Sequence, residues 1–94
     1  MVVRFWEARI AAGRLDDALR WTKQTLLVRA EGRPGFVSGQ VFVADEAIAT
    51  DERPEEPARI VLLTSWTENP GDLDETPPDD GSVERAHGWF FRSA

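Results

Sequence analysis

Three side chains near the C-terminus alternate along one stretch of the chain: His87, Trp89 and Phe91. In an extended strand, alternate residues point to the same face. Imidazole titrates close to neutral pH, so His87 could act as a general base or donate a hydrogen bond to a bound phenol or quinone oxygen. The aromatic neighbours would place it beside the core or at a cavity mouth. The alternative is a structural histidine at the start of the strand, hydrogen-bonded to the backbone.

Further candidate residues could line a pocket next to this histidine. Trp6 and Trp66 could form aromatic walls, with Trp66 stacking against a planar ligand, or both could be core residues. Arg85 shares a face with His87 in an ideal strand and is the arginine that we expect nearest to a site. The candidate catalytic residue is His87, and the candidate substrate-binding residues are Trp6, Trp66, Arg85, Trp89 and Phe91.

Several kinds of site are excluded by what the sequence lacks. The chain has no cysteine, which rules out disulfides, thiolate catalysis and cysteine-ligated metals. It contains no G-x-S-x-G nucleophile motif, no glycine-rich phosphate loop and no H-E-x-x-H zinc motif. One histidine among scattered carboxylates does not predict a metal site. We therefore expect neither a metal nor another cofactor.

The formal net charge is −6, and most acidic residues fall in two polar, proline-containing segments, 45–58 and 68–82. Basic residues are dispersed along the rest of the chain, which argues against a nucleic-acid partner. No apolar run approaches the ~20 residues of a membrane span, and strand-like alternation from Val2 leaves no space for a signal peptide. We therefore expect a soluble, cytoplasmic protein with no membrane partner.

The hydrophobic periodicity predicts four strands and one helix. Residues 2–10 alternate as a strand with apolar residues on both faces, and residues 14–31 carry an amphipathic helical stripe that ends at Gly32 and Pro34. Three more strands are expected over residues 36–44, 59–67 and 83–92, with the acidic segments as loops. We expect ion pairs between neighbouring strands, in which Glu7 or Glu84 pairs with Arg4, Arg9, Arg85 or Arg92.

The length of 94 residues predicts a single domain that covers residues 1–94. A chain of this size buries about 60–65% of its unfolded surface and gains stability from a partner subunit. Its four tryptophans and five phenylalanines supply a core and leave apolar surface for an interface.

Four features of the chain resemble the antibiotic biosynthesis monooxygenase-like (ABM) family of the dimeric α/β-barrel superfamily. They are Ala12-Gly13-Arg14 ahead of one long helix, Pro34-Gly35-Phe36 entering the second strand, Ser65-Trp66-Thr67 closing the third strand, and the pair Trp89 and Phe91 in the last strand. The resemblance implies an α+β, ferredoxin-like fold, two copies of which pack their antiparallel sheets into a dimeric α/β barrel. It therefore implies a homodimer.

Residues 69–81 depart from this resemblance, because family members have a second helix between the third and fourth strands. The segment reads NPGDLDETPPDDG, which cannot form an ordinary amphipathic helix. We therefore predict a βαββ-loop-β variant with one main helix. In this variant, the wall of the site on that side is a loop or is absent.

Two functions fit this interpretation. The resemblance implies a small cofactor-independent monooxygenase, or a related cyclase or isomerase, acting on an aromatic, polyketide-type substrate. The alternative is a non-catalytic dimeric barrel that binds a small aromatic ligand or serves as an interaction module. The missing helix and the scarcity of titratable groups around the candidate pocket favour the alternative.

Overall fold

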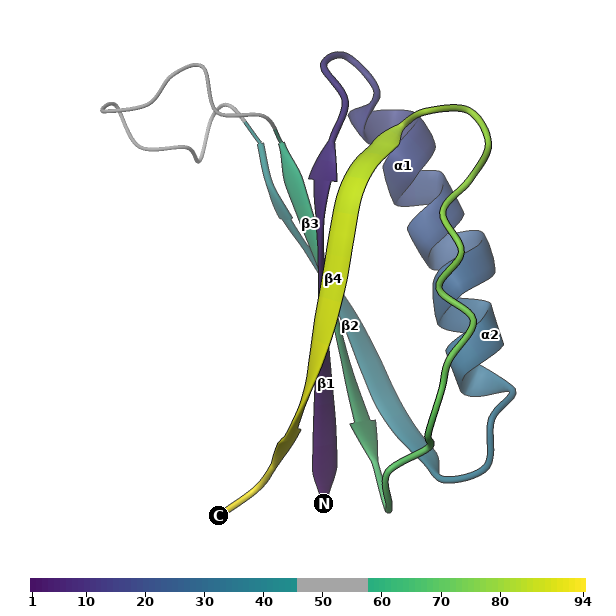
Figure 1. Cartoon of the computed structure of the whole chain (residues 1–94), viewed down its shortest axis with the longest axis vertical. Coiled ribbons are helices and arrows are strands. Elements are labelled where there is room, and N and C mark those ends of the chain that lie inside the picture. Colours follow the sequence, from purple (N-terminus) through teal and green to yellow (C-terminus); the bar gives the residue numbers. More distant parts are fainter. Residues whose placement is uncertain (46–57) are drawn as a thin grey trace.

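The computed structural model describes residues 1–45 and 58–94. Strand β1 (Val2–Ile10) leads into a helix of three consecutive pieces, α1 (Leu15–Trp21), η1 (Thr22–Leu26) and α2 (Leu27–Glu31). Strands β2 (Phe36–Ala44), β3 (Arg59–Trp66) and β4 (Val83–Arg92) follow. The helix lies over one face of the sheet, as Figure 1 shows. No helix or strand of the described residues covers the other face, which we call the open face.

The four strands form one antiparallel sheet in the order β2-β3-β1-β4. This order places β1 and β3 in the centre and is compatible with the predicted ferredoxin-like fold. The α+β class, the antiparallel sheet and the one main helix are confirmed. The acidic segment between β2 and β3 was predicted as a loop over residues 45–58, and its residues 46–57 lie outside the described part of the chain.

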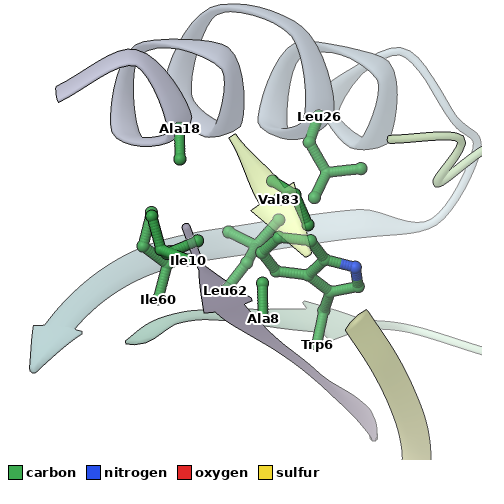
Figure 2. Close-up of a cluster of buried hydrophobic side chains, with 8 residues drawn as sticks. All are labelled: Trp6, Ala8, Ile10, Ala18, Leu26, Ile60, Leu62 and Val83. Atoms are coloured by element: carbon green, nitrogen blue, oxygen red, sulfur yellow. The ribbon is translucent and has the colours of Figure 1, made fainter. Parts of the chain in front are cut away.

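The alternation predicted for β1 is present and explains its central place. Trp6, Ala8 and Ile10 are buried toward the helix, whereas Phe5 on the opposite face is 40% exposed. The side chains under the helix form the hydrophobic core drawn in Figure 2, which consists of Trp6, Ala8, Ile10, Ala18, Leu26, Ile60, Leu62 and Val83. Burying this cluster requires the helix to lie across the middle of the sheet.

The helix spans residues 15–31, close to the predicted 14–31, and its middle piece has π-helical hydrogen bonding. Its buried residues lie four apart: Ala18, Thr22, Leu26 and Ala30. A wider π turn keeps residues with this spacing on one face. The Thr22 hydroxyl, buried in this stripe, donates to the Ala18 carbonyl oxygen at 2.8 Å. Val28 lies two residues from both Leu26 and Ala30, on the other side of the helix, and its side chain is 53% exposed.

Residues 69–82, which we call the strap, contain neither helix nor strand. The strap runs alongside the helix on its way from β3 to β4 (Figure 1). The prediction that residues 69–81 form a loop and not a second helix is therefore confirmed.

The Pro34-Gly35-Phe36 motif makes the turn from α2 into β2. Gly35 has a φ of 88°, a left-handed value that favours glycine. Its carbonyl oxygen accepts the Thr67 N–H at 2.9 Å, which joins the start of β2 to the end of β3. In residues 1–45 and 58–94, no helix is long and apolar enough to cross a membrane.

Candidate ligand-binding cleft

A cleft of about 270 Å³ lies between the helix, the sheet and the strap. Strands β1 and β3 supply its floor, the second half of the helix one wall, and the strap the other. Its lining residues are Arg4, Trp6, Leu26, Arg29, Ala30, Arg33, Leu62, Thr64, Leu73, Asp74 and Glu75. The volume lies just below the range of about 300–1,000 Å³ for ligand pockets, and the mainly apolar floor is typical of a site for a small organic molecule.

The floor combines an aromatic surface with one buried hydroxyl. Trp6 is 2% exposed and Leu62 4% exposed, and both face the helix (Figure 2). The Thr64 hydroxyl oxygen accepts a hydrogen bond of 2.8 Å from the Trp66 indole Nε1–H. A hydroxyl has one donor and two acceptor positions. Thr64 therefore keeps an O–H with which it can donate to an oxygen atom in the cleft.

An ion pair between Arg4 and Glu75 forms one side of the cleft. Arg4 Nε donates to Glu75 Oε2 at 2.8 Å, and Arg4 Nη2 donates to Glu75 Oε1 at 2.6 Å. The two side chains are 13% and 21% exposed. The guanidinium carbon also lies 4.5 Å from the centre of the Phe90 ring. This two-bond arrangement is the strong form of an arginine–carboxylate interaction.

The strap is held against the helix through its backbone. Arg33 donates to the carbonyl oxygens of Pro70 and Asp72 at 2.8 and 3.0 Å. Arg29 donates to the carbonyl oxygen of Asp74 at 3.3 Å. All three bonds are exposed to solvent, so water can compete for each of them.

Asp74 is the second carboxylate at the cleft, and its own strap neighbour keeps it ionised. Thr76 donates to Asp74 Oδ1 from its hydroxyl at 2.8 Å and from its backbone N–H at 3.1 Å. These two hydrogen bonds, with a smaller contribution from Arg29, lower the pKa of Asp74 below its ordinary value. Asp74 is therefore a poor proton acceptor near neutral pH.

The structure divides the predicted site residues between the two faces of the sheet. Trp6 and Trp66 lie on the helix face, and Trp6 stands opposite Gly88 in the β1–β4 register. The residues that alternate with these in β1 and β4 point to the open face. They pair there as Val3 with Phe91, Phe5 with Trp89, Glu7 with His87, and Arg9 with Arg85. Arg85, His87, Trp89 and Phe91 therefore share a face, as predicted, but their side chains do not share it with Trp6 or Trp66.

His87 is exposed and lies away from the core. Its ring packs edge-to-face on Trp89, with 4.5 Å between ring centroids. With Arg85 it borders two further hollows. One, of about 310 Å³, lies between β4 and the strap and includes Trp6 and Glu75. The other, of about 120 Å³, includes Glu7, Arg9 and Arg59. His87 therefore borders these two hollows at the edge strand β4. It does not line the cleft between helix, sheet and strap.

Trp66 is fully buried at 0% exposure and packs edge-to-face on Phe36, with ring centroids 5.5 Å apart. It does not line the cleft, so Trp66 is a core residue, which was one of the two roles considered for it from the sequence. It reaches the cleft only through its hydrogen bond to Thr64.

No protein-family model, no curated protein and no solved structure matches this chain. The resemblance to the ABM family stays a prediction from the motifs, and the function has to be argued from the geometry. Over the described ranges 1–45 and 58–94, no group of three or more His, Asp or Glu side chains could hold a metal ion.

Arg4, Thr64 and Glu75 were missed as site residues by the sequence-based reasoning. Arg4 was expected to pair with Glu7 or Glu84, but those carboxylates pair with Arg59 at 2.8 Å and with Arg9 at 3.3 Å. The alternation of β1 could have indicated Arg4, because Arg4 lies two residues from the buried Trp6 and therefore points to the same face of the strand. Glu75 lies in an irregular segment without periodicity, and no sequence pattern distinguishes it from the other strap acids.

Gly88 makes room for the Arg4 side chain. A Cβ atom at Gly88 would lie 2.8 Å from Arg4 Cζ and 3.0 Å from the Phe5 carbonyl oxygen. We therefore expect Gly88→Ala to push the guanidinium away from Glu75 and to lower the free energy of unfolding by about 1–3 kcal/mol. Urea denaturation measures this loss.

The matched control for this change is Gly32→Ala, where the nearest atom would lie at an ordinary 3.6 Å. We expect that variant to stay within about 0.5 kcal/mol of the wild type. Equal stability of the two variants would contradict the close approach of Arg4 to Gly88.

Proposed function

We propose that this protein binds a small planar aromatic molecule in the cleft between helix, sheet and strap. The observation that carries the proposal is a cleft of about 270 Å³ whose floor is formed by Trp6, Leu62 and Thr64. A flat apolar ring suits this lining, in which Trp6 and Leu62 are nearly buried and Leu73 of the strap is the more exposed apolar side chain, and the Thr64 hydroxyl offers one directed hydrogen bond. This function corresponds to the non-catalytic binding of a small aromatic ligand, which was predicted from the sequence as the alternative to a monooxygenase.

The placement of titratable groups supports binding over catalysis. A cofactor-independent oxygenase needs a group that removes a proton from its substrate, and the sequence offers one histidine for this role. His87 does not line the cleft. In the cleft, Asp74 has a lowered pKa and Glu75 is bonded to Arg4. The monooxygenase, cyclase or isomerase activity therefore has no supporting observation at this site.

The binding proposal is tested with 2-naphthol, a neutral bicyclic phenol, by isothermal titration calorimetry. We expect saturable binding to the wild type and about tenfold weaker binding to Thr64→Val, which keeps the side-chain shape and removes the hydroxyl. Thr64→Ser keeps the hydroxyl and is expected to bind within about twofold of the wild type.

Amide NMR shifts on titration locate the bound molecule. We expect the largest shifts at Trp6, Leu62 and Leu73, which come from the two floor strands and the strap. Absence of saturable binding, or shifts confined to the open face, would contradict the proposal.

We further propose that a second copy of this chain covers the open face, with the two sheets packed face to face. Large apolar side chains are exposed there: Phe5 at 40%, Phe42 at 50%, Trp89 at 46% and Phe91 at 52%. Phe5 and Phe91 already contact each other edge-to-face, with centroids 5.8 Å apart. Such a cluster on a small domain is typical of an interaction surface.

The size and shape of the open face suit a second sheet. Strands of nine residues span about 30 Å, and four strands about 19 Å, so the face approaches the area that one partner buries in a standard interface. A two-fold arrangement places the same aromatic patch on both sides of the interface. The cleft lies on the other face of the sheet and stays accessible in this dimer.

A further inference from the structure

We propose that the cleft selects aromatic carboxylates and that Glu75 is a built-in competitor for their binding site. The ligand carboxylate takes the place of the Glu75 carboxylate on Arg4, and the ring lies over Trp6. This inference rests on the proposed ligand-binding function and specifies the class of ligand.

Arg4 is a fixed cation beside an apolar floor. It projects from a central strand that pairs with β3 on one side and β4 on the other. Its guanidinium lies against the Phe90 ring, and its side chain as a whole is 13% exposed. A buried charge of this kind needs a paired counter-charge, because an unpaired one is strongly unfavourable. Whatever occupies the cleft next to Arg4 is therefore expected to be an anion.

Glu75 is the anion that now meets this need, and it comes from the strap, not from the sheet that carries Arg4. The strap has no regular secondary structure. Beside the cleft it is attached by exposed bonds to its carbonyl oxygens from Arg29 of α2 and from Arg33, which follows α2. Exchange of the carboxylate on Arg4 therefore requires displacement of the Glu75 side chain, while the sheet stays in place.

In this exchange, the carboxylate of the ligand replaces the carboxylate of Glu75 on Arg4. Glu75 binds Arg4 through two parallel N–H···O bonds at 2.8 and 2.6 Å. A planar aromatic carboxylate can form the same two bonds. It also adds a ring that fits on the apolar floor, which the Glu75 side chain does not supply. Arg29 and Arg33 line the same cleft; Arg29 pairs with Asp74 at 3.7 Å, and the three arginines outnumber the two carboxylates there, which favours the entry of an anion.

The test compares 2-naphthoate with 2-naphthol by calorimetry, in the wild type and in Glu75→Gln. Removal of the competing charge is expected to raise the affinity for 2-naphthoate about tenfold and to change that for 2-naphthol less than about twofold. Asp79→Asn is the matched control, because it removes one negative charge from an exposed strap position outside the cleft. Asp79→Asn is expected to leave both affinities unchanged.

Arg4→Met provides the second variant, with its fold checked by circular dichroism. It is expected to weaken 2-naphthoate at least about tenfold more than it weakens 2-naphthol. Equal effects of Glu75→Gln and Asp79→Asn, or retention of 2-naphthoate by folded Arg4→Met, would overturn the anion site while 2-naphthol binding still stands. If neither compound binds any of these proteins, the ligand-binding proposal fails as well.

Discussion

Trp66→Ala is expected to lower the free energy of unfolding by about 3–5 kcal/mol, the range for removal of a large aromatic side chain from a core. Trp66 is 0% exposed, packs on Phe36 and donates to Thr64, so its removal leaves a cavity and an unused hydroxyl acceptor together. The total stability of a domain of this size is about 5–15 kcal/mol. This one change therefore removes a large share of it.

Urea denaturation followed by circular dichroism measures the loss. The control is Val28→Ala, another large-to-small change, at a helix position that is 53% exposed. It is expected to change stability by no more than about 0.5 kcal/mol. A loss below about 1 kcal/mol in Trp66→Ala would show that the end of β3 is not part of the core, since such small losses are typical of surface positions.

Trp89→Glu is expected to weaken the proposed dimer at least about 100-fold, because it replaces an apolar contact with a carboxylate that a second sheet would desolvate. Trp89 is 46% exposed in the single chain, beside Phe5 in the register and in contact with His87. The folded monomer should therefore tolerate the change. Analytical ultracentrifugation over a concentration series measures the dissociation constant.

Lys23→Glu serves as the control, because Lys23 lies exposed on the helix, on the other side of the sheet. It reverses a charge without altering the open face and is expected to leave association unchanged. A wild-type protein that sediments as a monomer at micromolar concentration would contradict the dimer directly.

The layout of the sheet could be predicted from the sequence because its signals are local. Alternation in β1 and the apolar centre of β3 predicted the two central strands, and Gly32 with Pro34 predicted where the helix ends. The absence of the second helix followed from the prolines of the strap. Each of these signals acts over a few residues, which is the range that periodicity and turn chemistry describe.

The cleft could not be predicted in the same way, because its residues meet only in three dimensions. His87 was grouped correctly with Trp89 and Phe91, but alternation along β4 alone does not say which face the helix covers. That choice follows from the pairing of Trp6 with Gly88 and of Glu7 with His87. The Arg4–Glu75 pair joins residues 71 positions apart, and no local pattern links them.

The attachment of the strap has a consequence for how this protein can change over generations. Arg29 and Arg33 hold it by backbone carbonyl oxygens, which every amino acid possesses. Substitutions at Leu73 or Glu75 would therefore alter the shape and charge of the cleft without removing these bonds. A chain built in this way can acquire a new ligand preference through mutations in one short segment, while the sheet and its core remain as they are.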